Sequence, residues 1–307
     1  MRRCLLVTVV LALVLAPAPH ALGRWTRAVA MPHPRSAHAV VVARGSIYAL
    51  GGPGTAVVDR FDGRRWRRET TLPGGVANAP AAVALGASVY VLGGFAGATN
   101  EPSAALRVYD TRSRTWDSAA PLPAPRGGHA AAVLGGKIHV VGGGNAVSTI
   151  ADHSVYDPAT DTWSAAAPLP RAEGSPAAVA FGGKLYAIGG RSGTSDFGDV
   201  YVYDPARDAW SRGPSIPKRG TVGSAVYRGA IWVFGGESQA RFRVLGDVFR
   251  LPAGASRWTR VSTLPTPRNY ARAVVFGDAV YVVGGSTVAG ESHGARGSRL
   301  VDRFAAG

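Results

Sequence analysis

Arginine recurs at a fixed distance from a repeated glycine pair in this chain. The pairs begin at Gly51, Gly93, Gly142, Gly189, Gly235 and Gly284, and sixteen residues before them stand Arg35, Ala77, Arg126, Glu173, Arg219 and Arg268. A guanidinium group can form two parallel hydrogen bonds with a carboxylate or phosphate group. One hypothesis is therefore that the four arginines form a cationic ring that binds an acidic ligand. Glu173, at the equivalent position of its repeat, is a further ligand-binding candidate. The alternative is that these arginines reach outward and hold neighbouring loops.

Histidine and a further arginine follow close behind these positions. Three residues further on stand His38, Pro80, His129, Pro176, Val222 and Ala271. His38 and His129 have no acidic partner nearby in the sequence, which disfavours a metal pair. We predict no bound metal and place both histidines in the ligand-binding set. Arg272 interrupts a run of small residues, where a charge must face water or find a partner, so it is a further ligand-binding candidate.

A carboxylate and an arginine also follow one glycine pair. Glu237 comes directly after Gly235-Gly236, and Arg243 stands six residues later. A glutamate at such a place can transfer a proton while arginines hold a substrate carboxylate. The alternative is that Glu237 bonds to neighbouring loop amides and only braces the loop.

The glycine pairs belong to a repeat, with intervals of 42, 49, 47, 46 and 49 residues between them. Each pair closes a short apolar run, such as residues 89–92 or 280–283, and in most repeats a Tyr-Asp or related pair and then a tryptophan follow. A proline-rich turn and a strand poor in bulky residues, such as residues 130–134, begin the next repeat. Each repeat therefore predicts four short strands. Units of about 40 to 50 residues with four strands are typical of β-propellers.

The combination of Gly142-Gly143, Tyr156-Asp157 and Trp163, with its counterparts over roughly residues 24–305, resembles the Kelch repeat. The resemblance implies an all-β, six-bladed β-propeller. Small residues suit the innermost strands, where blades converge on the axis, and tryptophan suits the outer strands, where they diverge. The last repeat lacks a tryptophan, whereas residues 24–27 carry Trp25. We therefore expect the N-terminal strand to complete the sixth blade and close the ring.

Two enzyme families with Kelch-type propellers bear on function. Secreted galactose oxidases need a copper site with a Tyr–Cys crosslink, and the single cysteine, Cys4, lies in the predicted leader. That activity is therefore excluded. Bacterial N-acetylneuraminate epimerases are six-bladed Kelch propellers, and Gly235-Gly236-Glu237 with Arg243 is similar to their active-site motif. This resemblance implies a sugar mutarotase with Glu237 and Arg243 as catalytic residues.

The charge balance favours an acidic partner. The formal net charge is +15, and nearly all the cations are arginine. An exported protein of this kind meets acidic glycans, cell-wall polymers or acidic protein surfaces more often than nucleic acid. A genome that encodes arginine in place of lysine would give the same balance without any function. Our preferred hypothesis is a binding module for an acidic ligand at the channel mouth, without a cofactor, and the mutarotase is the alternative.

The first residues predict export. Arg2 and Arg3 precede an uncharged run over residues 4–16, followed by small residues and prolines, which is the layout of a secretory signal peptide. The run is too short for a comfortable membrane span. We therefore expect a signal peptide at residues 1–21, a propeller at residues 22–307, and a secreted or periplasmic monomer without a membrane span after cleavage.

Overall fold

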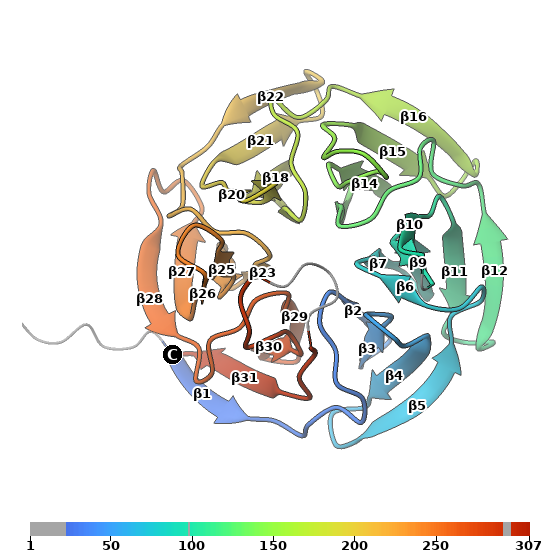
Figure 1. The fold of residues 1–307 in the computed structure, drawn as a ribbon, viewed down its shortest axis with the longest axis horizontal. Coiled ribbons are helices and arrows are strands. Elements are labelled where there is room, and N and C mark those ends of the chain that lie inside the picture. Colours follow the sequence, from blue (N-terminus) through green and yellow to red (C-terminus); the bar gives the residue numbers. More distant parts are fainter. Residues whose placement is uncertain (1–22, 98, 291–295) are drawn as a thin grey trace, which may run out of the picture.

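Six four-stranded antiparallel sheets make up most of the described chain. The computed structural model describes residues 23–97, 99–290 and 296–307, so the predicted signal peptide lies outside the described residues. The sheets stand in a ring around a central axis (Figure 1). None of the described residues is helical, which confirms the all-β prediction.

The sheets are numbered here in chain order, each from its innermost to its outermost strand. The first contains β2 (Ala39–Ala43), β3 (Ser46–Leu50), β4 (Val57–Phe61) and β5 (Trp66–Thr71). The second contains β7 (Ala81–Leu85), β8 (Ser88–Leu92), β11 (Leu106–Asp110) and β12 (Thr115–Ala119). The third contains β13 (Ala130–Leu134), β14 (Lys137–Val141), β15 (His153–Asp157) and β16 (Thr162–Ala166).

The other three sheets follow the same order. The fourth contains β17 (Ala177–Phe181), β18 (Lys184–Ile188), β21 (Val200–Asp204) and β22 (Ala209–Arg212). The fifth contains β23 (Gly223–Tyr227), β24 (Ala230–Phe234), β27 (Asp247–Pro252) and β28 (Thr259–Thr263). The sixth contains β29 (Arg272–Phe276), β30 (Ala279–Val283), β31 (Val301–Ala306) and β1 (Gly23–Arg27).

The hydrophobic core is divided between the sheets. Each of six apolar clusters in the described chain joins residues of two neighbouring sheets. One of them joins the sixth sheet to the first, through residues such as Tyr281 and Phe61. Burial of apolar side chains therefore holds every sheet against both of its neighbours.

The glycine pairs form the joints between neighbouring sheets. The first glycine of each pair has a φ of 51–66°. A side-chain carbon there would lie 2.4–2.8 Å from a backbone carbonyl oxygen of the next sheet, so only glycine fits. At five of the six joints in the described chain, the second glycine donates its N–H to that same carbonyl at 2.8–2.9 Å. These carbonyls belong to Arg35, Ala77, Arg126, Glu173, Arg219 and Arg268.

The N-terminal strand lies beside the C-terminal strand. β1 pairs with β31, and Trp25 stands opposite Phe304 with the two ring centroids 4.8 Å apart. The Trp25 indole also donates a hydrogen bond of 2.9 Å to Ser262 of the fifth sheet. The first and last described strands thus share the sixth sheet.

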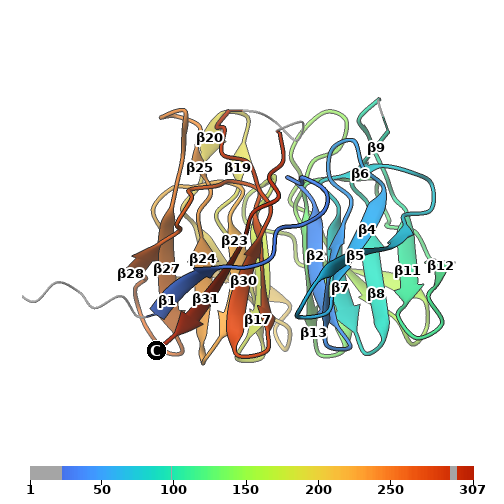
Figure 2. The same cartoon turned by 90° about the horizontal axis from the view of Figure 1, so that it is seen from below.

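The loops that follow the glycine pairs extend from one end of the ring, which we call the loop face (Figure 2). Several carry short strands of their own. These are β9 (Phe95–Ala96), β10 (Glu101–Pro102), β19 (Arg191–Ser192), β20 (Ser195–Asp196), β25 (Glu237–Ser238) and β26 (Arg243–Val244). β6 (Ala77–Asn78) pairs with β9 from the connection between the first and second sheets.

Candidate ligand-binding site

The four arginines that precede the glycine pairs are buried inside their own sheets. The side chains of Arg35, Arg126, Arg219 and Arg268 are 0%, 1%, 3% and 0% exposed. Each pairs with an aspartate of the same sheet: Arg35 with Asp59 at 2.7 Å, Arg126 with Asp152 at 3.2 Å, Arg219 with Asp247 at 3.4 Å and Arg268 with Asp302 at 2.5 Å. The expectation that they face the channel mouth as a cationic ring is therefore wrong. Each guanidinium is already neutralised within its own sheet.

Backbone contacts explain why arginine stands at this place. Arg35, Arg126 and Arg219 each donate a hydrogen bond to the carbonyl of the first glycine of their own sheet's pair. Burial lowers the pKa of all four arginines, and the aspartate partner acts in the opposite direction. The ion pairs thus fasten the glycine turn to the third strand of the same sheet.

The two exceptions to the arginine pattern fit this structural role. The second sheet has Ala77 in place of arginine, and Ala105 and Arg107 stand where other sheets place the aspartate. In the fourth sheet Glu173 is 0% exposed, and Arg171 supplies the cation, at 3.1 Å from Glu173 and 2.5 Å from Asp199. Burial raises the pKa of Glu173 to about 7, although Arg171 opposes the shift. Glu173 is thus part of the same bracing system and does not face the channel.

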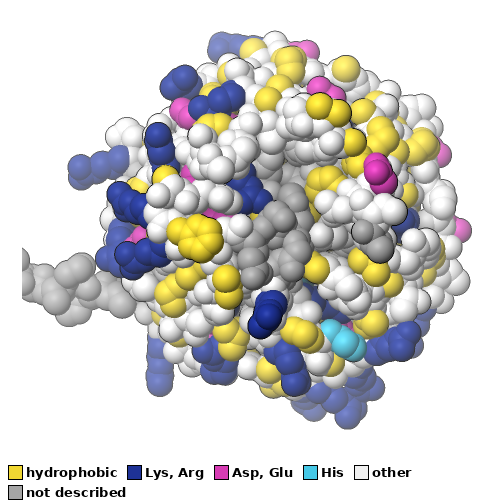
Figure 3. All heavy atoms as spheres, viewed as in Figure 1, with side chains coloured by type: hydrophobic (Ala, Val, Ile, Leu, Met, Phe, Trp, Pro, Cys, Tyr) yellow, Lys and Arg dark blue, Asp and Glu magenta, His cyan; other side chains and the backbone are white. Residues whose placement is uncertain are grey.

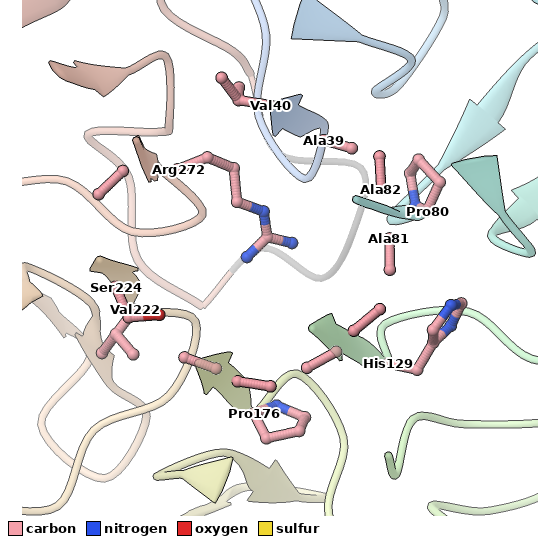
Figure 4. Close-up of a pocket in the computed structure, with 15 residues that line it drawn as sticks. Ala39, Val40, Pro80, Ala81, Ala82, His129, Pro176, Val222, Ser224 and Arg272 are labelled. Atoms are coloured by element: carbon pink, nitrogen blue, oxygen red, sulfur yellow. The ribbon is translucent and has the colours of Figure 1, made fainter. Parts of the chain in front are cut away.

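Arg272 is the arginine that reaches the axis. It begins β29, the innermost strand of the sixth sheet, and its guanidinium points into a central cavity of about 150 Å³ (Figure 4). The cavity is otherwise lined mainly by small residues from all six sheets, among them Ala39, Ala81, Ala130, Ala177 and Ser224. Arg272 Nε donates to the carbonyl of His38 at 2.8 Å. Among the described residues no carboxylate forms an ion pair with Arg272, and burial lowers its pKa.

His38 and His129 directly precede the innermost strands β2 and β13, and His129 is among the residues that line the axial cavity (Figure 4). They are 0% and 2% exposed, and within the described ranges none of their ring nitrogens has a hydrogen-bond partner. The His38 ring packs against Gly284 of the sixth sheet, and the His129 ring against Gly93 of the second. Pro80 and Pro176 stand at the corresponding places in the second and fourth sheets. Within the described ranges no group of three or more His, Cys, Asp or Glu side chains could hold a metal ion.

The packed histidines make an acid-sensitivity prediction. Burial lowers the pKa of His129 to about 3, with Arg126 and Arg272 adding to the shift. The unfolded chain takes up this proton near pH 6.5, so the free energy of unfolding should fall as the pH drops from about 6.5 towards 3. His129→Pro is expected to retain stability at pH 7.5 and to lessen this fall, because the backbone before it (Gly128, φ 60°) resembles that before Pro80 and Pro176. Urea unfolding at pH 4.5 and 7.5 measures the free energy of unfolding of the wild type and the variant. An equal fall in both proteins between these pH values would contradict the prediction.

Glu237 lies at the loop face, but its partner is not Arg243. Its carboxylate is 0% exposed and accepts hydrogen bonds from Arg191 at 2.8 Å and Asn269 at 2.7 Å. It also accepts from the Gln239 side chain at 3.3 Å and the Gly290 N–H at 3.2 Å. Arg243 is exposed on β26, opposite Ser238, and forms no ion pair among the described residues. The mutarotase alternative requires Glu237 and Arg243 to act together, whereas the structure pairs Glu237 with Arg191 and Asn269.

Sequence reasoning missed the residues that surround Glu237. Arg191 joins Glu237 to the hydroxyl of Tyr270, with which it forms a short hydrogen bond. Burial raises the pKa of Tyr270 to about 12. The sequence does contain one signal for the contact between Arg191 and Glu237. Arg191 directly follows Gly189-Gly190, as Glu237 directly follows Gly235-Gly236. Opposite charges at matching places in consecutive repeats can meet across a joint.

Comparison with known proteins agrees with this architecture. The model of the KLHDC2/KLHL20/DRC7 Kelch-repeats domain matches residues 82–285, so the chain belongs to the Kelch-repeat β-propeller family. Kelch-like protein 35 of Mus musculus is 30% identical over 126 residues, which are 39% of this chain and 21% of the mouse protein. Kelch-like protein 25 of Xenopus tropicalis is 42% identical over 69 residues, 22% of this chain and 12% of that protein. The chain thus spans about a fifth or less of these relatives.

A solved structure supports the fold independently. The structure of YjhT superposes with a TM-score of 0.77 over 88% of this chain and 94% of that one, at 15% sequence identity. This likeness concerns the fold alone. In the described part of the chain, no helix has the length and apolar character that crossing a membrane requires.

Proposed function

We propose that this chain is a secreted module that binds the anionic group of an acidic ligand in its axial cavity, with Arg272 as the receiving cation. The supporting observation is that Arg272 lacks an acidic partner among the described residues, whereas the four arginines before the glycine pairs all have one. Arg272 is partly buried. A cation that is partly removed from water without a counter-charge bears a desolvation cost, and an incoming anion relieves that cost.

The size of the cavity limits what enters. A volume of about 150 Å³ corresponds to roughly five water molecules at about 30 Å³ each. That is room for a carboxylate, sulfate or phosphate group and a few neighbouring atoms. An acidic glycan, a cell-wall polymer or an acidic protein surface can present such a group, while the rest of the ligand stays on the loop face. The proposal requires neither a metal nor a cofactor, and a single copy of the chain suffices.

A glycan array probed at low and high salt tests this function. Glycans with carboxylate or sulfate groups are expected to bind, and neutral glycans of the same backbone are not. Acidic peptides form a second arm that separates a protein partner from a sugar. Equal binding of neutral and acidic glycans would contradict the proposal.

The alternative is a sugar mutarotase, in which Glu237 transfers a proton. Four donors hold the Glu237 carboxylate, and it does not line the axial cavity, which favours the bracing role. Anomer exchange of N-acetylneuraminate, followed by proton NMR, is therefore expected to proceed only at its spontaneous rate. Exchange that the wild type accelerates and the Glu237→Gln variant does not would replace the binding function with the enzyme.

We infer further that the ring is a closed six-bladed propeller, in which Gly23–Arg27 supplies the last strand. The pairing of β1 with β31 and the apolar cluster between the sixth and first sheets support this. Trp25→Ala should lower the free energy of unfolding by about 2 kcal/mol, below the usual range for a buried tryptophan because Trp25 is only half-buried. Urea unfolding measures this change in the free energy of unfolding. A loss no larger than that for Thr26→Ala, an exposed neighbour on the same strand, would contradict the closure.

A further inference from the structure

Two arginines stand directly opposite each other on the outer strands of the first sheet. Arg60 on β4 and Arg67 on β5 are register partners. Like charges in this arrangement destabilise an antiparallel pair. The next three sheets place Val108–Asp117, Val155–Ser164 and Val202–Ser211 there. The first sheet thus bears a local cost that its neighbours avoid, and such exceptions tend to mark functional sites.

The pair belongs to a larger basic groove of about 220 Å³, lined by Arg60, Arg67, Arg68 and Arg114 together with Asp62 and Glu69. Arg67 and Arg114 are 55% and 62% exposed. We call this feature the outer arginine groove. Lys and Arg side chains gather on the rim of the ring over β5 (Figure 3).

The acidic residues of the groove are largely engaged within the fold. Asp62 accepts the backbone N–H groups of Arg64 and Arg65, each at 2.9 Å. Glu69 is 7% exposed and accepts the hydroxyl of Tyr109 at 2.9 Å. The same carboxylates also pair with groove arginines, Asp62 with Arg67 at 3.8 Å and Glu69 with Arg114 at 3.2 Å. Four arginines against two carboxylates leave the groove with a net positive charge.

Protection of an exposed sheet edge does not explain these arginines. β5 is the outermost strand of its sheet, and charged residues at such an edge hinder pairing with another chain. However, the other outermost strands differ in this respect: β12 and β16 contain neither lysine nor arginine, β22 and β28 contain one arginine each, and β1 contains two. The edge position alone therefore does not call for a basic cluster.

We propose that the outer arginine groove binds an anionic polysaccharide, at a site separate from the axial cavity. Guanidinium groups match the sulfate, phosphate or carboxylate groups that recur along such a polymer. Single-stranded nucleic acids usually need aromatic side chains on which bases can stack. The aromatic residues nearest the groove, Trp66 and Tyr109, are buried, and the exposed large hydrophobic residues of the described chain lie elsewhere. A polymer without bases is therefore the better fit.

The experiment compares binding of heparin, a sulfated polysaccharide, to matched variants. Arg60→Val/Arg67→Ser recreates the neutral pair of the third and fourth sheets, so the fold should accept it. We expect heparin affinity to fall about tenfold, and the slope of log affinity against log salt to fall by about two. The melting temperature should stay the same or rise, because the like-charge pair is removed.

Arg207→Ser/Arg257→Ser is the control, because it removes two exposed arginines from the fourth and fifth sheets and changes the net charge equally. This control should bind heparin nearly as the wild type does. Equal losses in the control and groove variants would overturn the proposal, because attraction would then reflect net charge alone. Wild-type affinity in the groove variant would also overturn it.

Two further probes identify the polymer class. Polygalacturonate carries carboxylates in place of sulfates, and weaker binding of it by the groove variant than by the wild type would extend the site to carboxylated polymers. If heparin alone is affected, the site is assigned to sulfated polymers. A single-stranded oligonucleotide that binds more tightly than either polysaccharide, with the same loss in the groove variant, would overturn the assignment to a polysaccharide.

Discussion

Asp59→Ala is expected to lower the free energy of unfolding by about 3–5 kcal/mol, because it leaves the buried cation of Arg35 without a counter-charge. Both side chains of this pair are 0% exposed, and their closest atoms are 2.7 Å apart. Two backbone carbonyls, those of Gly51 and Val57, would remain as acceptors for Arg35. They carry only partial charges, so they compensate the cation incompletely. Urea unfolding followed by tryptophan fluorescence measures the loss.

A double variant separates a broken ion pair from simple loss of packing. Arg35→Met/Asp59→Leu replaces the pair with apolar side chains, and such replacements are often close to neutral. We expect it to be more stable than Asp59→Ala. The second sheet, with Ala77 and no aspartate partner, is a natural precedent in the same chain. If Asp59→Ala unfolds like the wild type, the bracing role of this ion pair would be wrong.

The sequence predicts the strand pattern well because each strand type carries its own physical signature. The glycine pairs mark joints where a side chain would collide with the next sheet, and small residues such as Ala130 and Ala177 mark the crowded axis. The spare Trp25 indicated that the N-terminal strand would lie in the last sheet, beside β31. These features are local, so they can be recognised in each repeat separately.

The direction of the arginines could not be predicted in this way. Their aspartate partners lie 24, 26, 28 and 34 residues later in the chain, because the intervening loops differ in length. An alignment at fixed distance from the glycine pairs reveals the arginines but hides their partners. The same limit applies to Arg191 and Glu237, which are 46 residues apart and meet across a joint.

Arg272 could be identified from the sequence as a candidate for the axial cavity, because it is a charged residue among the small residues of the innermost strands. What the sequence could not reveal is that the other candidate cations are neutralised inside their sheets, which leaves Arg272 as the arginine that lines the axial cavity. The histidines could not be assigned from the sequence either. Their packing against Gly93 and Gly284 depends on how neighbouring sheets meet.

Arg272→Met is expected to lower affinity for an acidic ligand about 10- to 100-fold, the equivalent of about 1.4–3 kcal/mol for hydrogen bonds to a charged group. The same substitution should leave the free energy of unfolding unchanged or raise it, because it removes a cation without an acidic partner and keeps the apolar stem. This opposite response of binding and stability is what separates a ligand-binding arginine from a bracing one.

The most direct test therefore measures both quantities for Arg272→Met and Arg268→Met, using the acidic glycan that binds best on the array. Calorimetric titration gives the affinity, and urea unfolding gives the stability. We predict that Arg272→Met loses affinity without losing stability. Arg268→Met should lose stability, because the buried Asp302 would keep only the exposed Arg27, 3.2 Å away, as its counter-charge. Arg268→Met protein that still folds should bind almost normally. If Arg272→Met binds the glycan as tightly as the wild type, the axial cavity is not the binding site and the proposed function is wrong.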